Sequence, residues 1–342
     1  MAEVFVLGAG FSRAISNSMP LLNELGQELE RRLDKRILPH DTRLPIADFE
    51  NWLSFLAEDQ PWLTEEEHLR HRATFLSASR LICEVIFERE IKARRSAPPD
   101  WLRALVARWH EDRAKVITFN YDNLVEAAYT DVVKVYGAGG STDINYVTPV
   151  QLRTTPMMPI FARSGGVLGP SFVETFNLMK LHGSRSWMYS GRQTFYGETI
   201  YDACRVDGWS ADDERPIKDW LIADKVPLVV PPTAGKTNFF NNETIRLEWR
   251  HAFNSLRDAD RIWLVGYSFP ETDLLVRFLL QHGYTDGTPV VVVNPGFDVK
   301  ERVEHLLSKT ATHVPIEYLD DAAKIAGLIP PQDPNPIAPI VR

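Results

Sequence analysis

Short apolar runs alternate with helical patterns along this chain of 342 residues, and most of the runs end at a glycine or an asparagine. A run of four or five Val, Ile, Leu or Phe residues bounded by turn signals is typical of a strand buried on both faces. Such strands, alternating with helices, form a parallel sheet covered by helices on both faces. The sequence therefore predicts an α/β fold, with strands at Val4–Leu7, Lys115–Phe119, Val226–Val230, Arg261–Val265 and Val290–Val293.

A long helical segment interrupts this alternation. The residues Asn17–Pro20 are typical of a helix start, and leucines then recur at helical spacing up to Leu33. The pattern stays helical from Ile46 to His110, so we interpret residues 34–112 as a helical module inserted into a main domain of residues 1–330. Residues 136–225 predict a smaller subdomain of loops and hairpins, and residues 331–342 a Pro-rich tail.

Composition narrows the classes of protein. A net charge of -8 argues against a broad nucleic-acid surface, which would need a basic stripe. No stretch approaches the roughly 20 apolar residues of a membrane span, and no signal peptide is visible. Cys83 and Cys204 are the two cysteines, too few for a disulfide framework or a four-cysteine zinc site. We expect a cytoplasmic chain without zinc or membrane contact.

The first strand runs into a loop rich in glycine, which reads Gly8-Ala9-Gly10-Phe11-Ser12-Arg13. Glycines let backbone N–H groups approach a diphosphate, and the start of a helix favours its negative charge. A hydroxyl and a guanidinium beside the glycines also suit a phosphate. The third glycine of the usual dinucleotide motif is missing, however. From these residues alone, a tight turn without a ligand is an equal alternative.

Polar residues follow the other strands. Asn120 and Asp122 come directly after a predicted buried strand, at the edge where open α/β sheets bind ligands. The alternative is that one of them caps the helix that follows. His182 follows another apolar run and precedes Gly183, and a lone histidine is more often a structural hydrogen-bonding residue than a base. Two further turns or strand ends carry Gly266, Ser268 and Asn294.

Taken in order, these motifs resemble the NAD site of the Sir2 superfamily, from Val4 to about Asn294. That site has a GAGxS loop, an Asn-x-Asp strand end, a His-Gly turn, a Gly-x-Ser turn and a late strand ending in Asn. The resemblance implies that NAD is the substrate. It assigns the phosphate loop to Gly8, Ala9, Gly10, Phe11, Ser12 and Arg13, phosphate and adenosine contacts to Gly266, Ser268 and Asn294, and catalysis to Asn120, Asp122 and His182.

The chain departs from the protein-deacylating sirtuins at three places. Phe119 stands where they usually carry Gln, Ser16–Leu22 replaces their Gly-Ile-Pro-Asp-Phe-Arg segment, and Cys204 is the one cysteine after the His-Gly turn, where they carry two zinc-binding pairs. The chain is more similar to Sir2-like effectors of prokaryotic antiphage defence, which hydrolyse NAD to deplete it in infected cells.

The resemblance therefore implies a Rossmann-like enzyme that hydrolyses NAD to nicotinamide and ADP-ribose. Asn120 would hold the water or a ribose hydroxyl, and His182 would act as the base, since an imidazole has an ordinary pKa of about 6.5. Asp122 would hold the nicotinamide amide or position Asn120. The alternatives are a deacylase, an ADP-ribosyltransferase, or a subunit that senses NAD or ADP-ribose without turnover.

A constitutive NAD hydrolase would be toxic, and no sensor domain is visible in this chain. We therefore expect a homo-oligomer and a separate sensor or ATPase subunit, of the HerA-like helicase or Argonaute type. The predicted helical module is the segment expected to contact it.

Overall fold

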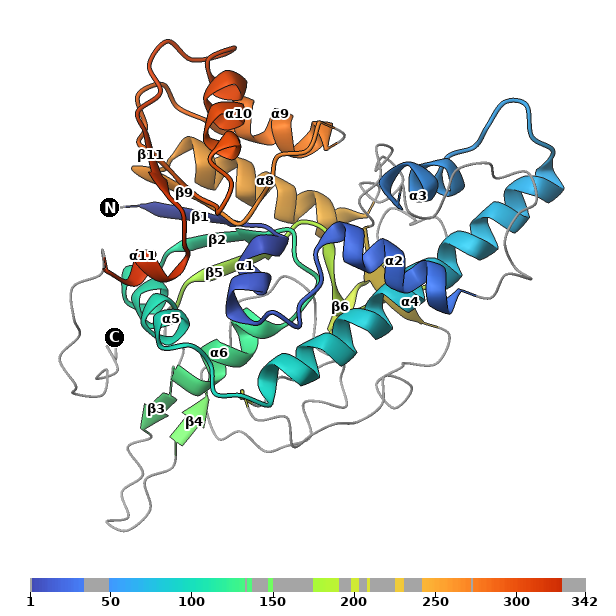
Figure 1. The fold of residues 1–342 in the computed structure, drawn as a ribbon, viewed down its shortest axis with the longest axis horizontal. Coiled ribbons are helices and arrows are strands. Elements are labelled where there is room, and N and C mark those ends of the chain that lie inside the picture. Colours follow the sequence, from blue (N-terminus) through green and yellow to red (C-terminus); the bar gives the residue numbers. More distant parts are fainter. Residues whose placement is uncertain are drawn as a thin grey trace.

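The computed structural model describes residues 2–33, 49–132, 134–136, 147–149, 175–190, 198–202, 208–209, 225–230, 242–271 and 273–327. Its centre is a six-stranded sheet in which every pair of neighbours is parallel (Figure 1). The strands are β1 (Glu3–Leu7), β2 (Lys115–Thr118), β5 (Asn177–Lys180), β9 (Arg261–Val265), β10 (Val290–Val293) and β11 (Ile316–Leu319).

The strand order in this sheet is β11-β10-β9-β1-β2-β5. The chain builds outward from β1 through β2 to β5, and then returns to the other side of β1 and builds outward again from β9 to β11. This is the strand order of the Rossmann fold, and the direction of building reverses between β1 and β9. The predicted Rossmann-like α/β class is confirmed.

Helices cover both faces of the sheet because successive strand side chains point to opposite sides. On one face lie α1 (Ala9–Ile15), α5 (Asp100–Asp112), α6 (Leu124–Val132) and α11 (Ala323–Gly327). On the other lie α8 (Glu243–Arg257), α9 (Leu274–Gly283) and α10 (Asp298–Leu307). Figure 1 shows the two layers on either side of β1.

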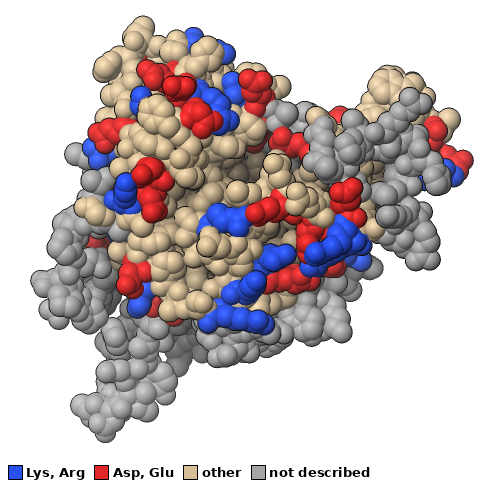
Figure 2. Space-filling model, viewed as in Figure 1, with Lys and Arg blue, Asp and Glu red and all other residues tan. Residues whose placement is uncertain are grey.

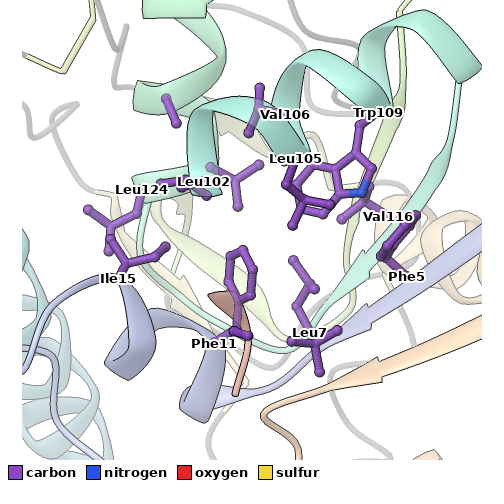
Figure 3. Packing of buried hydrophobic residues seen from close by; sticks show 14 of the residues in the cluster. Phe5, Leu7, Phe11, Ile15, Leu102, Leu105, Val106, Trp109, Val116 and Leu124 are labelled. Atoms are coloured by element: carbon purple, nitrogen blue, oxygen red, sulfur yellow. The ribbon is translucent and has the colours of Figure 1, made fainter. Parts of the chain in front are cut away.

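Aromatic rings fill the layer between the sheet and α5. Phe5 on β1 meets Trp109 on α5 edge to face, with ring centroids 5.3 Å apart (Figure 3). Phe11 on α1 meets Trp101 with ring centroids 5.7 Å apart. Burying a large apolar side chain stabilises a fold by about 1.5–3 kcal/mol relative to leaving it exposed. This packing fixes α1, and with it the loop that joins β1 to α1.

A second body of the fold combines helices with an antiparallel sheet. The helices are α2 (Leu22–Arg32), α3 (Phe49–Ala57) and α4 (Glu65–Arg94), and the sheet has the order β7-β6-β8, with β6 (Gly183–Tyr189), β7 (Tyr201–Asp202) and β8 (Val226–Val229). The long helix α4 begins with a capping box, in which the Thr64 N–H donates to the Glu67 carboxylate at 2.7 Å. Apart from both bodies, β3 (Lys134–Tyr136) pairs with β4 (Val147–Pro149).

The structure corrects several expectations. The run at 226–230 forms β8 of the antiparallel sheet, because an apolar run does not specify its pairing partner, and β5 takes the edge of the parallel sheet. Within the segment 34–112 predicted as an insert, α5 packs on the parallel sheet, and β5 lies inside the predicted subdomain 136–225. The rest of the domain division stays a prediction.

The first helix also begins earlier than predicted. Gly8 is the N-cap of α1, so the helix follows β1 at once, and Asn17–Pro20 form the turn between α1 and α2, whose N-cap is Leu21. The tail 331–342 and part of the predicted hairpin Trp187–Tyr196 lie outside the described residues.

Charges of both signs share the described surface. On the face drawn in Figure 2, Lys and Arg side chains over α2 and α4 have Asp and Glu side chains beside them. Arg32 pairs with Glu28 and Glu88, and Arg31 pairs with Glu28. Within the described ranges no helix is long and apolar enough to cross a membrane, and no cluster of three His, Cys, Asp or Glu could hold a metal.

Alanine substitution of two glycines with positive φ, Gly266 and Gly287, measures how tightly the turns after β1 and β9 pack together. Gly266 (φ 64°) would bring an added Cβ within 2.2 Å of the Phe11 nitrogen, whereas Gly287 (φ 85°) has nothing within 4 Å of that position. Gly287→Ala should cost about 1 kcal/mol of unfolding free energy from backbone strain. Gly266→Ala should cost a further amount of about 1–3 kcal/mol from overpacking. Urea unfolding of both variants measures these costs. Equal losses of unfolding free energy would show that the turn after β1 and the turn at Gly266 separate easily.

Candidate functional site

The sequence motifs meet at one edge of the parallel sheet. Gly8, Asn120, His182, Gly266 and Asn294 each follow the end of a strand, and the strands β1, β2, β5, β9 and β10 all point the same way. This is the carboxyl edge, where open α/β sheets bind their ligands. The edge includes the reversal point between β1 and β9.

The glycines of the first loop pack against the turn after β9. The Gly10 N–H donates to the Gly266 carbonyl at 2.8 Å, and a Cβ on Gly10 would lie 2.7 Å from that oxygen. A Cβ on Gly8 would lie 2.5 Å from the Cα of Tyr267. These positions therefore require glycine for contact between two loops, whether or not a phosphate binds.

This contact uses donors that the sequence assigned to a phosphate. Besides the Gly10 N–H, the Phe11 N–H donates within the chain, to the Gly8 carbonyl at 2.9 Å. The Phe11 side chain is buried in the core under α5 (Figure 3). Ala9 is the exposed residue of this loop.

Three polar side chains form a hydrogen-bonded chain across the β1 and β2 ends. The Asn120 amide nitrogen donates to the Gly8 carbonyl and to the Ser12 hydroxyl, both at 2.9 Å. The Ser12 hydroxyl donates to Asp122 Oδ2 at 2.7 Å, and the N–H of Leu124 donates to Asp122 Oδ1 at 3.2 Å. The structure thus brings Ser12, Asn120 and Asp122 together.

These contacts fix the orientation of the Asn120 amide. A backbone carbonyl only accepts hydrogen bonds, so the NH₂ group of Asn120 must face Gly8, and its Oδ1 must point away from both Gly8 and Ser12. Of the two residues considered as helix caps, Asp122 is the one that accepts from the first turn of α6. The Asn120 side chain makes its described hydrogen bonds to Gly8 and Ser12 instead.

Burial perturbs the Asp122 carboxyl, which is 7% exposed. Removal from water raises its pKa to about 6 from the ordinary value of 3.8, and the charge of Glu90 acts in the same direction. The hydrogen bond from Ser12 and the charge of Lys180 oppose this. The carboxyl therefore titrates close to neutral pH.

His182 lies among aromatic rings at the end of β5. Its ring centroid is 4.9 Å from that of Phe119 and 6.4 Å from that of Trp249, and the residue is 4% exposed. Phe119 in turn contacts Tyr267, whose hydroxyl donates to Asp273 at 2.6 Å. The histidine thus lies between rings from the residue that follows β2 and from α8.

The remaining predicted residues make other contacts. Arg13 donates to the Asn17 carbonyl at 2.6 Å and forms an ion pair with Glu24, so its guanidinium lies with the α1–α2 turn. Asn294 donates to the Tyr267 carbonyl at 3.4 Å and thereby joins β10 to the turn after β9. Ser268 in that turn is exposed.

A buried ionic network lies behind the Asn120–Asp122 loop, and the sequence patterns did not predict it. Arg185 donates through two nitrogens to Glu90 on α4, both at 2.6 Å, and the Asn123 N–H donates to the same carboxylate at 3.0 Å. Lys180 donates to Glu126 at 2.7 Å. The available signal was a lysine in an apolar strand run, where a charge is unusual unless it is paired.

Comparisons with known proteins add little to this geometry. No protein family model matches the chain, and no curated protein matches it in sequence. A solved mutant of a Sir2 homologue with ADP-ribose shares 13% identity, covers 96% of this chain and 90% of that chain, and has a TM-score of 0.42. A Sir2 structure with a p53 peptide and NAD+ shares 17% over 96% and 91%, with a TM-score of 0.38. Similarity at this level does not establish a shared activity.

The shifted pKa of Asp122 predicts a pH-dependent cost to stability. The folded value, about 6, lies above the ordinary value of 3.8, so stability from this group is complete below about pH 4 and is lost as the pH rises through about 6. The gap of about 2.2 pH units corresponds to about 3 kcal/mol. Asp122→Asn removes the titration. The difference in unfolding free energy between the variant and the wild type should therefore shift in favour of the variant by about 3 kcal/mol from pH 4 to pH 8. Urea unfolding across that range tests this, and parallel curves would contradict it.

Proposed function

We propose that this chain hydrolyses the nicotinamide–ribose bond of NAD and releases nicotinamide and ADP-ribose, as a Sir2-like NAD glycohydrolase. The observation that carries the proposal is the hydrogen-bonded set of Ser12, Asn120 and Asp122 at the carboxyl edge of a Rossmann-ordered sheet. Sheets of this order bind dinucleotides at that edge, beside the reversal of strand order. The motifs that resemble the Sir2 superfamily supply the residues there.

Cleavage of the nicotinamide–ribose bond needs little acid catalysis from the protein. Cleavage of the bond passes through an oxocarbenium-like state, as glycoside hydrolysis does. Nicotinamide leaves as a neutral molecule, so no acid is needed. The water oxygen bonds to the ribose carbon while one of its protons passes to a base. The protein must therefore hold the ribose, place the water and accept that proton.

Asn120 is assigned to the water or to a ribose hydroxyl. Both of its amide hydrogens are engaged by Gly8 and Ser12, so the group left for a ligand is the Oδ1 acceptor. A water or a hydroxyl is the donor that this acceptor requires. The nitrogen contacts hold the oxygen in place before the substrate arrives, which lowers the cost of orientation.

Asp122 is assigned to positioning rather than to substrate contact. It is buried, and both of its oxygens accept hydrogen bonds from within the chain. In the ionised state it keeps the Ser12 hydrogen turned away from Asn120, so that the Asn120 amide can donate to Ser12 without competition.

His182 is assigned as the base. The rings of Phe119 and Trp249 flank it, and an imidazole is the side chain that most often serves as a general base. For the diphosphate we propose the exposed residues Ala9 and Ser268, on either side of the contact between the glycine loop and Gly266.

The resemblance also carries a biological proposal. Depletion of NAD would act in antiphage defence, restrained by oligomerisation or by a sensor or ATPase subunit. In infected cells that carry the chain, NAD should fall, and it should hold in cells that carry an inactive variant.

Incubation of the purified chain with NAD, with all products followed in time, tests the proposal. Equal amounts of nicotinamide and ADP-ribose, formed without any peptide, are expected. Products that form only with an acylated peptide would favour a deacylase, and ADP-ribose bound covalently to protein would favour a transferase. Bound but intact NAD would favour a sensor.

Two substitutions at the edge should separate turnover from folding. Asn120→Ala removes the assigned acceptor, and His182→Gln removes the base, which is typically worth about 10²–10⁴ in rate. Both variants should fold and bind NAD, while nicotinamide release falls by at least about 10²-fold. Asn120→Ala should cost about 1–3 kcal/mol in stability, since two hydrogen bonds are lost.

Two buried polar residues, Asn242 and His110, serve as matched controls. Asn242 caps α8 and makes two comparable bonds, to the Glu198 carbonyl at 2.8 Å and from the Thr244 N–H at 2.9 Å. His110 on α5 is 7% exposed and contacts Thr175 at 3.0 Å. Asn242→Ala and His110→Gln should lower the melting temperature without lowering turnover. Folded, fully active Asn120→Ala and His182→Gln variants would refute the assigned roles.

A further inference from the structure

Lys180 on β5 is a buried cation at the back of the candidate site. It is 1% exposed, and its ammonium has three described acceptors: the Asp122 carbonyl at 2.7 Å, Asn123 Oδ1 at 3.1 Å and Glu126 Oε1 at 2.7 Å. An ammonium has three hydrogens, so this arrangement satisfies it completely. A buried charge persists only when it is paired and hydrogen-bonded in this way.

Two of the acceptors, on Asp122 and Asn123, lie on the segment that joins β2 to α6, directly after Asn120. The third, Glu126, lies in the first turn of α6. Lys180 itself lies two residues before His182 on the adjacent strand. The ladder between β2 and β5 ends where the Leu181 N–H donates to the Thr118 carbonyl at 3.0 Å. The lysine side chain adds a link between the two segments that carry the proposed catalytic groups.

Neighbouring residues strengthen the same link. Ser184, two residues after His182, donates to Asn123 Oδ1 at 2.9 Å, so this oxygen accepts from both sides of the histidine. The Arg185 N–H donates to the Tyr121 carbonyl at 3.0 Å. The segment Lys180–Arg185 and the segment 121–126 thus form one hydrogen-bonded unit, in which the Lys180 ammonium donates to three acceptors.

We propose that Lys180 is a positioning residue for the reaction: it holds the Asn120–Asp122 loop at a fixed place relative to His182 without touching the substrate. This inference rests on the proposed NAD hydrolysis. Misplacement of reacting groups by about 1 Å can cost about 10²-fold in rate, so the spacing between these two segments is worth a dedicated side chain.

The test removes the cation without leaving a buried charge behind. Lys180→Met alone would strand the Glu126 carboxylate, so the informative variant is Lys180→Met with Glu126→Leu, because an apolar replacement of a buried ion pair is often neutral for stability. The double variant should melt close to the wild type and bind NAD within about threefold, with kcat lower by about 10²-fold. Amide exchange in the peptide around 119–125 should be faster, with the rest of the chain unchanged.

Glu28→Gln is the matched control. Glu28 on α2 is 7% exposed and ion-paired with Arg31 and Arg32, outside the segments that Lys180 joins. Glu28→Gln should lower the melting temperature and leave both kcat and the amide exchange of residues 119–125 unchanged. Asn123→Ala, which removes one neutral acceptor of Lys180, gives a second reading if the double variant does not fold: kcat should fall by about tenfold.

A folded double variant with wild-type kcat and unchanged exchange would overturn the inference, and so would Asn123→Ala with both unchanged. If the wild type itself releases no nicotinamide, the proposed function fails, and the exchange data still decide on their own whether Lys180 holds the loop. Faster exchange confined to 119–125 supports that role, and unchanged exchange overturns it.

Discussion

The contact between two backbone turns, at Gly10 and Gly266, sets the geometry of the carboxyl edge. One N–H···O bond of 2.8 Å joins them, and neither position has room for a Cβ. The strands β1 and β9 belong to the two halves of the sheet, on either side of the strand reversal, and this contact joins the turns that follow them. The polar residues that follow β2, β5 and β10 lie at the same edge of the sheet.

Charge burial behind the loop is the second constraint. Glu90, Arg185, Lys180 and Glu126 are all removed from water to a large extent, and each charge has an oppositely charged partner. Ion pairs of this kind add little net stability, because desolvation offsets their attraction, but they are strongly directional. Asp122 nearby has no ion pair described at its carboxylate, and burial raises its pKa.

The sequence predicted the elements better than the contacts. Buried strands such as Val290–Val293 are uniform in composition and end at a turn, so their existence and their shared edge follow from pattern alone. Pairing does not follow, which is why the run at 226–230 was assigned to the wrong sheet. The short strand β5 carries Asn177 and Lys180 at its ends, so its apolar signal is weak.

Side-chain partners were also out of reach of local patterns. The Ser12 hydroxyl donates to a residue 110 positions away, a partner that the local motif did not predict. Arg13 likewise pairs with Glu24 on the following helix. Glu90 and Arg185 are 95 positions apart and meet only because α4 and β6 pack together. Local patterns in a single sequence carry no information about which distant residues pair, whereas each strand-end motif spans only a few residues and could be recognised.

The helix α4 is a continuous rod of 30 residues with Glu90 near its inner end. At about 1.5 Å per residue it extends for about 45 Å. The Asn123 N–H donates to Glu90, so the backbone behind the site is attached directly to this long helix. Excising α2–α4 to obtain a minimal Rossmann core would remove the carboxylate that pairs with the Arg185 guanidinium and accepts from the Asn123 N–H. The helices α2–α4 therefore belong to the structure that supports the Asn120–Asp122 loop.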